Sequence, residues 1–244
     1  MPSTRPHRSA LKLCLAATAL AGGACAHAEG VLDGSVDGFG GTVSLQSDSR
    51  YRGLSYSDEK PDAQVTVSYD GAAGWYGGAM LTHVRFGPGR QGQLAQGYAG
   101  KVFNLATGLD AEAGVQFNSF NGLGRYDYAE AYVGLLAERW NARLYYANDY
   151  FGTAQHTVYA ELNGNWPLSA SLQAFAHAGV LEGRGGPYAE TRSSQRFDWR
   201  AGAAWRHGIY ELQLAWVEVG RGGTYTWTDS SHRRTLVLGV SASF

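Results

Sequence analysis

The chain has 244 residues and a formal net charge of −1, and 17% of its residues are charged. This balance argues against a nucleic-acid partner, because proteins that bind nucleic acids usually carry a basic excess. Glycine (34 residues) and tyrosine (15) are abundant while proline (6) and methionine (2) are scarce, which favours many strands joined by tight turns.

The N-terminal segment is typical of a secretory signal peptide. Basic residues precede an apolar run over 13–21, and a small-residue cleavage site ends at Ala28. We therefore expect residues 1–28 to be removed, taking both cysteines with them, and residues 29–244 to form one exported domain. Lipid anchoring at Cys25 fits less well, because no branched apolar residue stands just before it. The apolar run is too short for a spanning helix, and no comparable segment follows.

Period-two alternation divides the mature chain into about twelve segments of about ten residues, the length of strand that crosses a bilayer at a tilt. The segments are 39–50, 61–70, 75–86, 93–103, 109–119, 126–137, 139–150, 155–166, 170–182, 196–206, 209–219 and 233–244. Within 139–150, Trp140, Ala142 and Leu144 share one face, whereas Asn141 and Arg143 share the other. Strands of this kind fit a wall with lipid on one side.

The connections alternate in length along the chain. The short ones are 71–74, 104–108, 138, 167–169 and 207–208, and the longer ones are 53–60, 87–92, 120–125, 151–154, 183–195 and 220–232. Outer-membrane barrels show this asymmetry between periplasmic turns and extracellular loops. A soluble periplasmic sandwich also alternates, but it would not explain the regular connections or the aromatic residues near strand ends. The sequence therefore predicts an all-β, transmembrane, antiparallel up-and-down β-barrel of about 12 strands.

The final segment alternates up to the last residue, with Leu236, Leu238, Val240 and Phe244 on one face. We expect this strand to pair with the first one and to close the barrel. A terminal aromatic residue after such a strand resembles the signal that outer-membrane proteins present to the barrel-assembly machinery. We therefore expect a cell outer membrane location, with outer-membrane lipid and that machinery as partners.

Several short motifs carry a family resemblance. Residues 47–57 read Ser-Asp-Ser-Arg-Tyr-Arg-Gly-Leu-Ser-Tyr-Ser, and together with 61–64, 74–78 and 149–152 they resemble the motifs of the TorF-type porins of proteobacteria. The chain departs from that pattern at Ser49 and Tyr56. The resemblance implies an outer-membrane barrel that forms a pore. It implies no catalytic residues and no particular substrate.

Strand parity assigns a set of charged side chains to the barrel interior as candidate pore-lining residues. They are Asp48, Arg50, Arg52, His83, Arg85, Glu112, Glu130, Arg143, Glu161, Asp198 and Arg200. If the connection near Phe151 closes symmetrically, Arg143 and Glu161 lie opposite each other on neighbouring strands, within range of an ion pair. Such charges either pair to make the interior tolerable or line an aqueous path, and their balance argues against strong ion selectivity.

Arg50 and Arg52 have the inward parity of Asp48 at the end of the first strand. Two interpretations remain open. The arginines could form a filter at the mouth of the barrel, or they could be solvated or locally paired loop residues beside Asp48, Asp58 and Glu59.

Barrel width bears on function, because about eight strands are filled by side chains whereas 16 to 18 leave an open channel. Twelve strands predict a narrow, partly obstructed lumen that gives passive passage to small hydrophilic solutes or ions. We expect no cofactor, since the histidines lack metal-ligand spacing and no phosphate-binding glycine motif occurs.

Two other functional classes compete with a porin. The first is an outer-membrane lipid hydrolase, for which His156 is the best-placed histidine; the residue two positions on is Val158, so no nucleophile accompanies it. We therefore do not expect an enzyme. The second is a non-conducting barrel whose two longest loops, 183–195 and 220–232, bind a surface ligand or fold inward.

Overall fold

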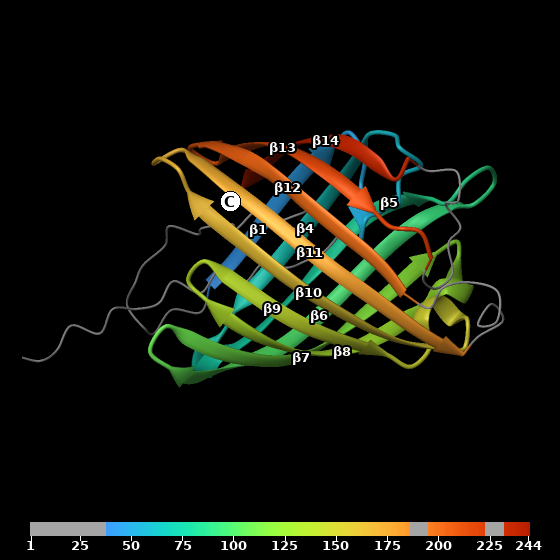
Figure 1. Ribbon diagram of the computed structural model, residues 1–244, viewed down its shortest axis with the longest axis horizontal. Helices are drawn as coiled ribbons and strands as arrows, with labels where there is room; N and C mark the ends of the chain where they lie inside the picture. The colour runs from blue at the N-terminus through green and yellow to red at the C-terminus, as the bar shows by residue number, and fades with distance from the viewer. Residues whose placement is uncertain (1–37, 186–194, 223–231) are drawn as a thin grey trace, which may run out of the picture.

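The computed structural model describes residues 38–185, 195–222 and 232–244, and it confirms the predicted fold as a closed antiparallel barrel (Figure 1). The barrel strands are β1 (Gly38–Gln46), β4 (Asp62–Asp70), β5 (Trp75–Arg85), β6 (Gln91–Ala106), β7 (Leu109–Asn121), β8 (Tyr128–Ala137), β9 (Trp140–Ala147), β10 (Gln155–Pro167), β11 (Leu172–Gly185), β12 (Gln195–His207), β13 (Tyr210–Val219) and β14 (Arg234–Ser243). From β4 onward each strand pairs with the next in sequence.

The barrel closes through pairing of its last strand with its first, as predicted from the sequence. β14 pairs antiparallel with β1, from Thr42 opposite Ser243 to Gln46 opposite Gly239. Beyond that register, Gly41 and Phe244 exchange two backbone hydrogen bonds of 2.8 and 3.0 Å. The closed ring leaves no free sheet edge, because every barrel strand has two neighbours.

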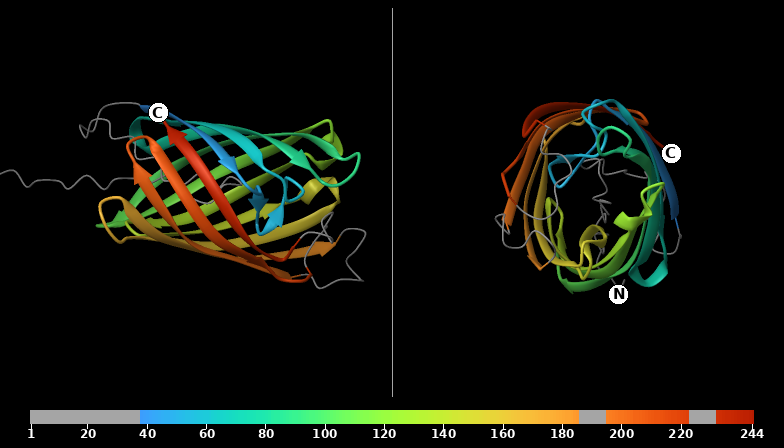
Figure 2. Two further views of the ribbon diagram at one scale, coloured as in Figure 1. Left: turned by 90° about the horizontal axis from the view of Figure 1, so that it is seen from above. Right: turned by 90° about the vertical axis from the view of Figure 1, so that its right-hand side faces the viewer.

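The connections divide between the two ends of the barrel. Short turns lie at the end where Phe244 sits, and the longer connections lie at the opposite end (Figures 1 and 2). The predicted signal peptide, 1–28, lies outside the described residues, as do residues 186–194 and 223–231 of the two longest loops. The predictions made for those segments therefore stay predictions.

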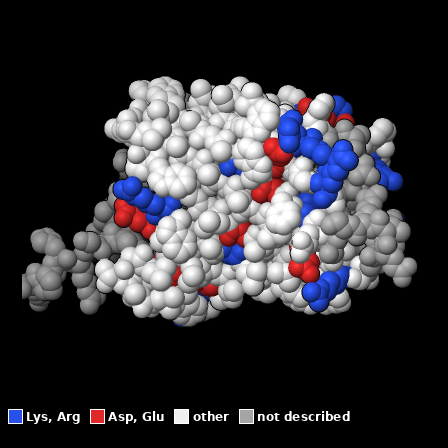
Figure 3. All heavy atoms as spheres, in the orientation of Figure 1, with Lys and Arg blue, Asp and Glu red and all other residues white. Residues whose placement is uncertain are grey.

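The outer surface carries a broad band of apolar side chains. Leu81, Val133, Leu162, Trp199 and Leu238 each expose more than a third of their surface, although they lie in the middle of their strands. On the face that Figure 3 shows, the largest group of charged side chains lies near the right-hand end, a smaller group lies near the left-hand end, and most of the surface between them is uncharged. Such an exterior is costly in water and favourable against lipid chains.

The segment between β1 and β4 differs from the prediction. β1 ends at Gln46 instead of continuing to Arg50, and residues 47–61, here called the inner segment, fold into the barrel (Figure 2). The inner segment contains a small hairpin of β2 (Arg50–Tyr51) and β3 (Leu54–Ser55). Its turn residues, Arg52 (φ 49°) and Gly53 (φ 77°), both adopt the left-handed conformation that a two-residue hairpin of type I′ requires.

Aromatic packing holds the inner segment inside. Tyr56 is 1% exposed and packs edge-on against Phe86, with ring centroids 5.2 Å apart, and Phe120 and Phe151 lie close to it. Short 3-10 helices complete this cluster: η2 (Gly124–Tyr126) and η3 (Tyr150–Gly152) contribute buried aromatic rings, while η1 (Ala72–Gly74) lies in a short turn. No helix in the described ranges is long and apolar enough to cross a membrane.

Removing Phe244 should impair folding and assembly, because the residue extends the closing strand pair to Gly41. We expect a smaller heat-modifiable fraction on electrophoresis and less barrel in the outer membrane. Ile209→Ala removes another exposed apolar side chain and is the matched control. Equal assembly of the truncated and control proteins would contradict the role given to the last residue.

Candidate functional site: the barrel lumen

Most of the predicted interior residues do lie inside the barrel. Glu112, Glu130, Arg143, Glu161 and Asp198 are buried on the inner faces of their strands, and the inward-facing Arg200 is half-buried. Asp48, Arg50 and Arg52 reach the interior by another route, because they belong to the inner segment and not to a barrel strand.

The interior assignment of His83 and Arg85 is corrected by the structure. On β5 the buried inner face carries Tyr76, Met80 and Thr82, so His83 and Arg85 share the parity of the exposed Leu81. The parity assignment took the polar face of this strand as the inner one, which fails here because this wall is lined by aromatic and aliphatic side chains that pack in the buried core. Arg85 lies at the strand end, where its Nη1 is 4.0 Å from Oδ1 of Asp62.

The central feature of the lumen is an ion pair between the inner segment and the wall. Arg52 donates from Nη1 and Nη2 to the two carboxylate oxygens of Glu130 on β8, at 2.9 and 2.8 Å. Both side chains are at most 3% exposed. Burial alone would lower the pKa of Arg52, but the facing Glu130 carboxylate offsets this and holds that pKa above its ordinary value. The guanidinium therefore stays charged.

Tyrosine rings surround this guanidinium. The carbon at its centre lies 4.1 Å from the ring centroid of Tyr159 and 4.7 Å from that of Tyr51, with Tyr145 and Tyr150 slightly farther away. A cation gains from aromatic faces most where water is excluded. The charge pair and the rings together fix the tip of the hairpin against β8, β9 and β10.

The tip also touches the opposite wall. A Cβ atom on Gly53 would lie 2.8 Å from the Cβ atoms of both Asp198 on β12 and Val219 on β13, so only glycine fits. Arg52, the preceding residue, reaches β8. The hairpin therefore reaches across the lumen near the long-loop end, from β8 to β12 and β13.

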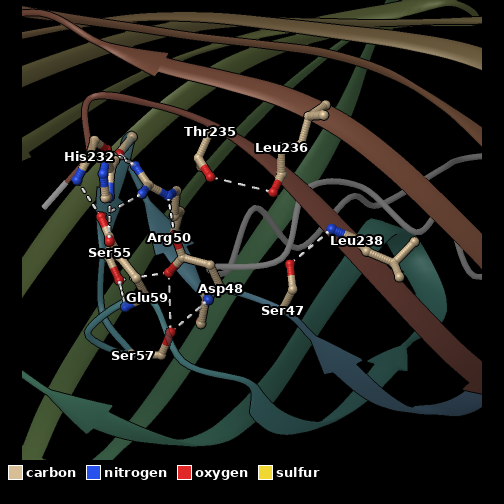
Figure 4. A network of polar contacts seen from close by, with 12 residues as sticks. Ser47, Asp48, Arg50, Ser55, Ser57, Glu59, His232, Thr235, Leu236 and Leu238 are labelled. Atoms are coloured by element: carbon tan, nitrogen blue, oxygen red, sulfur yellow. Dashed lines mark hydrogen bonds and ion pairs between the residues drawn. The ribbon is translucent and has the colours of Figure 1, made fainter.

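A second network ties the base of the inner segment together (Figure 4). Asp48 accepts hydrogen bonds from Nε of Arg50 at 2.5 Å and from Oγ of Ser55 at 2.6 Å. Arg50 also donates to the carbonyl oxygen of His232, 2.9 Å away. The backbone N–H of His232 donates to Glu59, whose other carboxylate oxygen lies 2.6 Å from Nδ1 of that histidine. Partial burial opposes ionisation of Glu59, but these bonds outweigh it and lower its pKa.

These contacts decide part of the question about the two arginines. Arg50 and Arg52 are 8% and 7% exposed, so the interpretation as solvated loop residues is wrong. Local pairing is confirmed for Arg50 with Asp48 and Glu59. Arg52 instead pairs with a distant strand. The filter interpretation stays a prediction.

The predicted register of Arg143 opposite Glu161 is confirmed. Nε of Arg143 donates to Oε1 of Glu112, 2.5 Å away on β7. Gly134 of β8 stands between these two residues in the register, and a Cβ there would lie 2.6 Å from Oε1 of Glu112. Because Gly134 has no side chain, Arg143 on β9 and Glu112 on β7 can contact each other across β8.

A third polar group lies on β10, β11 and β12. Nε2 of His177 is 2.9 Å from Oδ1 of Asp198, and its Nδ1 is 2.7 Å from Oδ1 of Asn163. The hydroxyl of Tyr159 donates to both oxygens of Asp198 at 3.3 and 3.4 Å. Sequence reasoning omitted Tyr159 and Arg196 from the candidate residues. The parity that Arg196 shares with Asp198 and Arg200 could have found it.

Gly134→Val should destabilise the barrel by about 2 kcal/mol or more, because the new side chain separates two buried charges. Urea unfolding in lipid vesicles measures this cost. Gly97→Val is the matched control, since a Cβ at Gly97 meets nothing within 4 Å. Equal costs at the two positions would show that the ion pair across Gly134 does not matter.

Two solved porin structures share this architecture. The KdgM porin aligns with a TM-score of 0.51 at 11% identity, over 86% of this chain and 99% of that chain. The NanC porin aligns with a TM-score of 0.54 at 11% identity, over 84% of this chain and 99% of that chain. At these identities the likeness concerns the fold alone. A comparison with curated proteins finds no significant match.

The sequence model of one protein family, described as "Bacterial protein of unknown function (Gcw_chp)", matches residues 33–244. The comparisons do not confirm the resemblance to the TorF-type porins. The match to the Gcw_chp model spans the whole barrel, including the inner segment and the closing strand. The chain therefore belongs to the Gcw_chp family.

Proposed function

We propose that this protein is an outer-membrane porin that gives passive passage to small hydrophilic solutes or ions through a narrow lumen. The main support for the proposal is that the closed barrel wall is apolar on its outer face and largely polar on its inner face. Apolar side chains cover the outside, while ion pairs and amides line much of the inside. The porin fold of KdgM and NanC supports it.

The inner segment sets the width of the path in this proposal. Its hairpin spans the lumen near the long-loop end, where Arg52 meets Glu130 and Gly53 meets Asp198. Toward the short-turn end, half-buried polar residues such as Gln173, Arg200 and Arg206 line the wall instead. Solutes would enter that part of the lumen readily, and they would pass the hairpin only beside it or when it moves.

The proposal includes a location and partners. The apolar outer band would contact outer-membrane lipid, and the strand ending at Phe244 would engage the barrel-assembly machinery. We propose no lipid hydrolysis: Nδ1 of His156 lies 3.4 Å from the hydroxyl of Tyr146 on the outer surface, and Val158 follows on the same face.

Weakening the central ion pair should open the path. In Arg52→Ala the hairpin loses its charge contact with Glu130 and its contact with the tyrosine rings, so we expect single-channel conductance in planar bilayers to rise several-fold. Replacing residues 49–57 by a short glycine-serine linker should raise it further.

Lys60→Gln is the matched control, because Lys60 lies in the same segment but is exposed and pairs only locally with Asp58. It should conduct like the wild type. Heat-modifiable mobility verifies that each variant is folded. Folded variants that conduct no better than the wild type would contradict the obstruction, and a silent linker variant would contradict the porin function itself.

A further inference from the structure

Several buried polar atoms in the described part of the chain lack a hydrogen-bond partner, among them Oε1 of Gln64, and the charged ones in the lumen are all arginine nitrogens. Among the described residues, the buried charged atoms that lack a hydrogen-bond partner include Nε and Nη1 of Arg196, Nε of Arg200 and Nε of Arg52. No carboxylate oxygen in the described ranges is in this condition. Buried polar groups are nearly always paired, so the lumen has unused capacity for a hydrogen-bond acceptor. Formal charge alone does not reveal this.

Arg196 lies on the inner face of β12 and is 1% exposed. Its register neighbour on β11 is Leu181, and Tyr159 stands opposite Leu181 on β10. Neither side chain supplies a carboxylate. The guanidinium is close enough to act electrostatically on Tyr56 of the inner segment and on Tyr150 of η3. A buried cation in these surroundings needs an anion or an equivalent acceptor.

Arg200 stands four residues further along the same inner face, about 13 Å away at the usual rise of a strand. Its Nη2 donates to Oε1 of Gln213 at 2.8 Å, and its guanidinium lies 4.9 Å from the ring centroid of Phe175. Its Nε has no partner. Asp198, between the two arginines, is already bonded to His177 and Tyr159. That carboxylate is therefore not a dedicated counter-ion for either arginine.

We propose that the inner face of β12 is a binding track for oxyanion-bearing solutes, with Arg200 and Arg196 as successive sites. This inference rests on the proposed passage function and names the class of solute. A guanidinium offers parallel N–H donors that match a carboxylate or a phosphate group. Half-buried Arg200 meets a solute arriving from the short-turn end, and Arg196 receives it when the inner segment moves.

Binding tests the track independently of conduction. Glucuronate and glucose are matched probes, because they differ by a carboxylate in place of a hydroxymethyl group. With the full-length barrel in detergent, calorimetry should show glucuronate binding about tenfold more tightly than glucose. Arg200→Gln should remove most of this difference, and Arg200→Lys should restore part of it. Equal affinity for the two sugars, or an unchanged preference in Arg200→Gln, would overturn the proposal.

Ion selectivity provides a second test. In a potassium chloride gradient, the reversal potential should show a preference for chloride that falls several-fold in Arg196→Gln and further in the double variant with Arg200→Gln. Arg184→Gln changes an exposed arginine outside the lumen and should leave the potential unchanged. A cation preference in the wild type would refute the track. A barrel that binds glucuronate but carries no current would instead refute the porin function and leave the binding site intact.

Discussion

Closure of the sheet is the constraint on which the rest of this structure depends. Because β14 pairs with β1, every barrel strand has two neighbours and the ring has no free edge. Each strand must then give one face to the exterior and the other to the lumen. The apolar band outside and the buried ion pairs inside both follow from that geometry. A register slip of one residue would exchange them.

The charged side chains of the lumen differ in whether they have an ionic partner, and this difference matters more than their number. Arg52 and Arg143 meet carboxylates across strands or across the lumen, and these pairs rigidify the wall beside the tyrosines. On β12, Arg196 and Arg200 have no such partner at Nε. The inner segment contacts β8 and β10 on one side and β12 and β13 on the other. The unpaired donors of Arg196 and Arg200 are the ones that the proposed oxyanion track uses.

Alternation, connection length and the final strand were enough to predict the barrel and the register of Arg143 with Glu161 from sequence. They could not predict the inner segment, because Arg50 and Arg52 continue the parity of the first strand, while the contacts of Arg52 with Glu130 and of Arg50 with His232 join residues far apart in sequence. Polarity also misplaced His83, since the inner face of β5 packs against aromatic residues. Long-range contacts of this kind leave no local pattern.

The most direct test of the account is solute uptake by liposomes that contain the purified wild-type barrel. A narrow lumen obstructed by the inner segment predicts that the smallest hydrophilic solutes enter faster than into protein-free liposomes, and that uptake falls steeply as solute size increases. Uptake equal to that of protein-free liposomes, from a barrel shown to be folded, would contradict the central claim that this protein conducts.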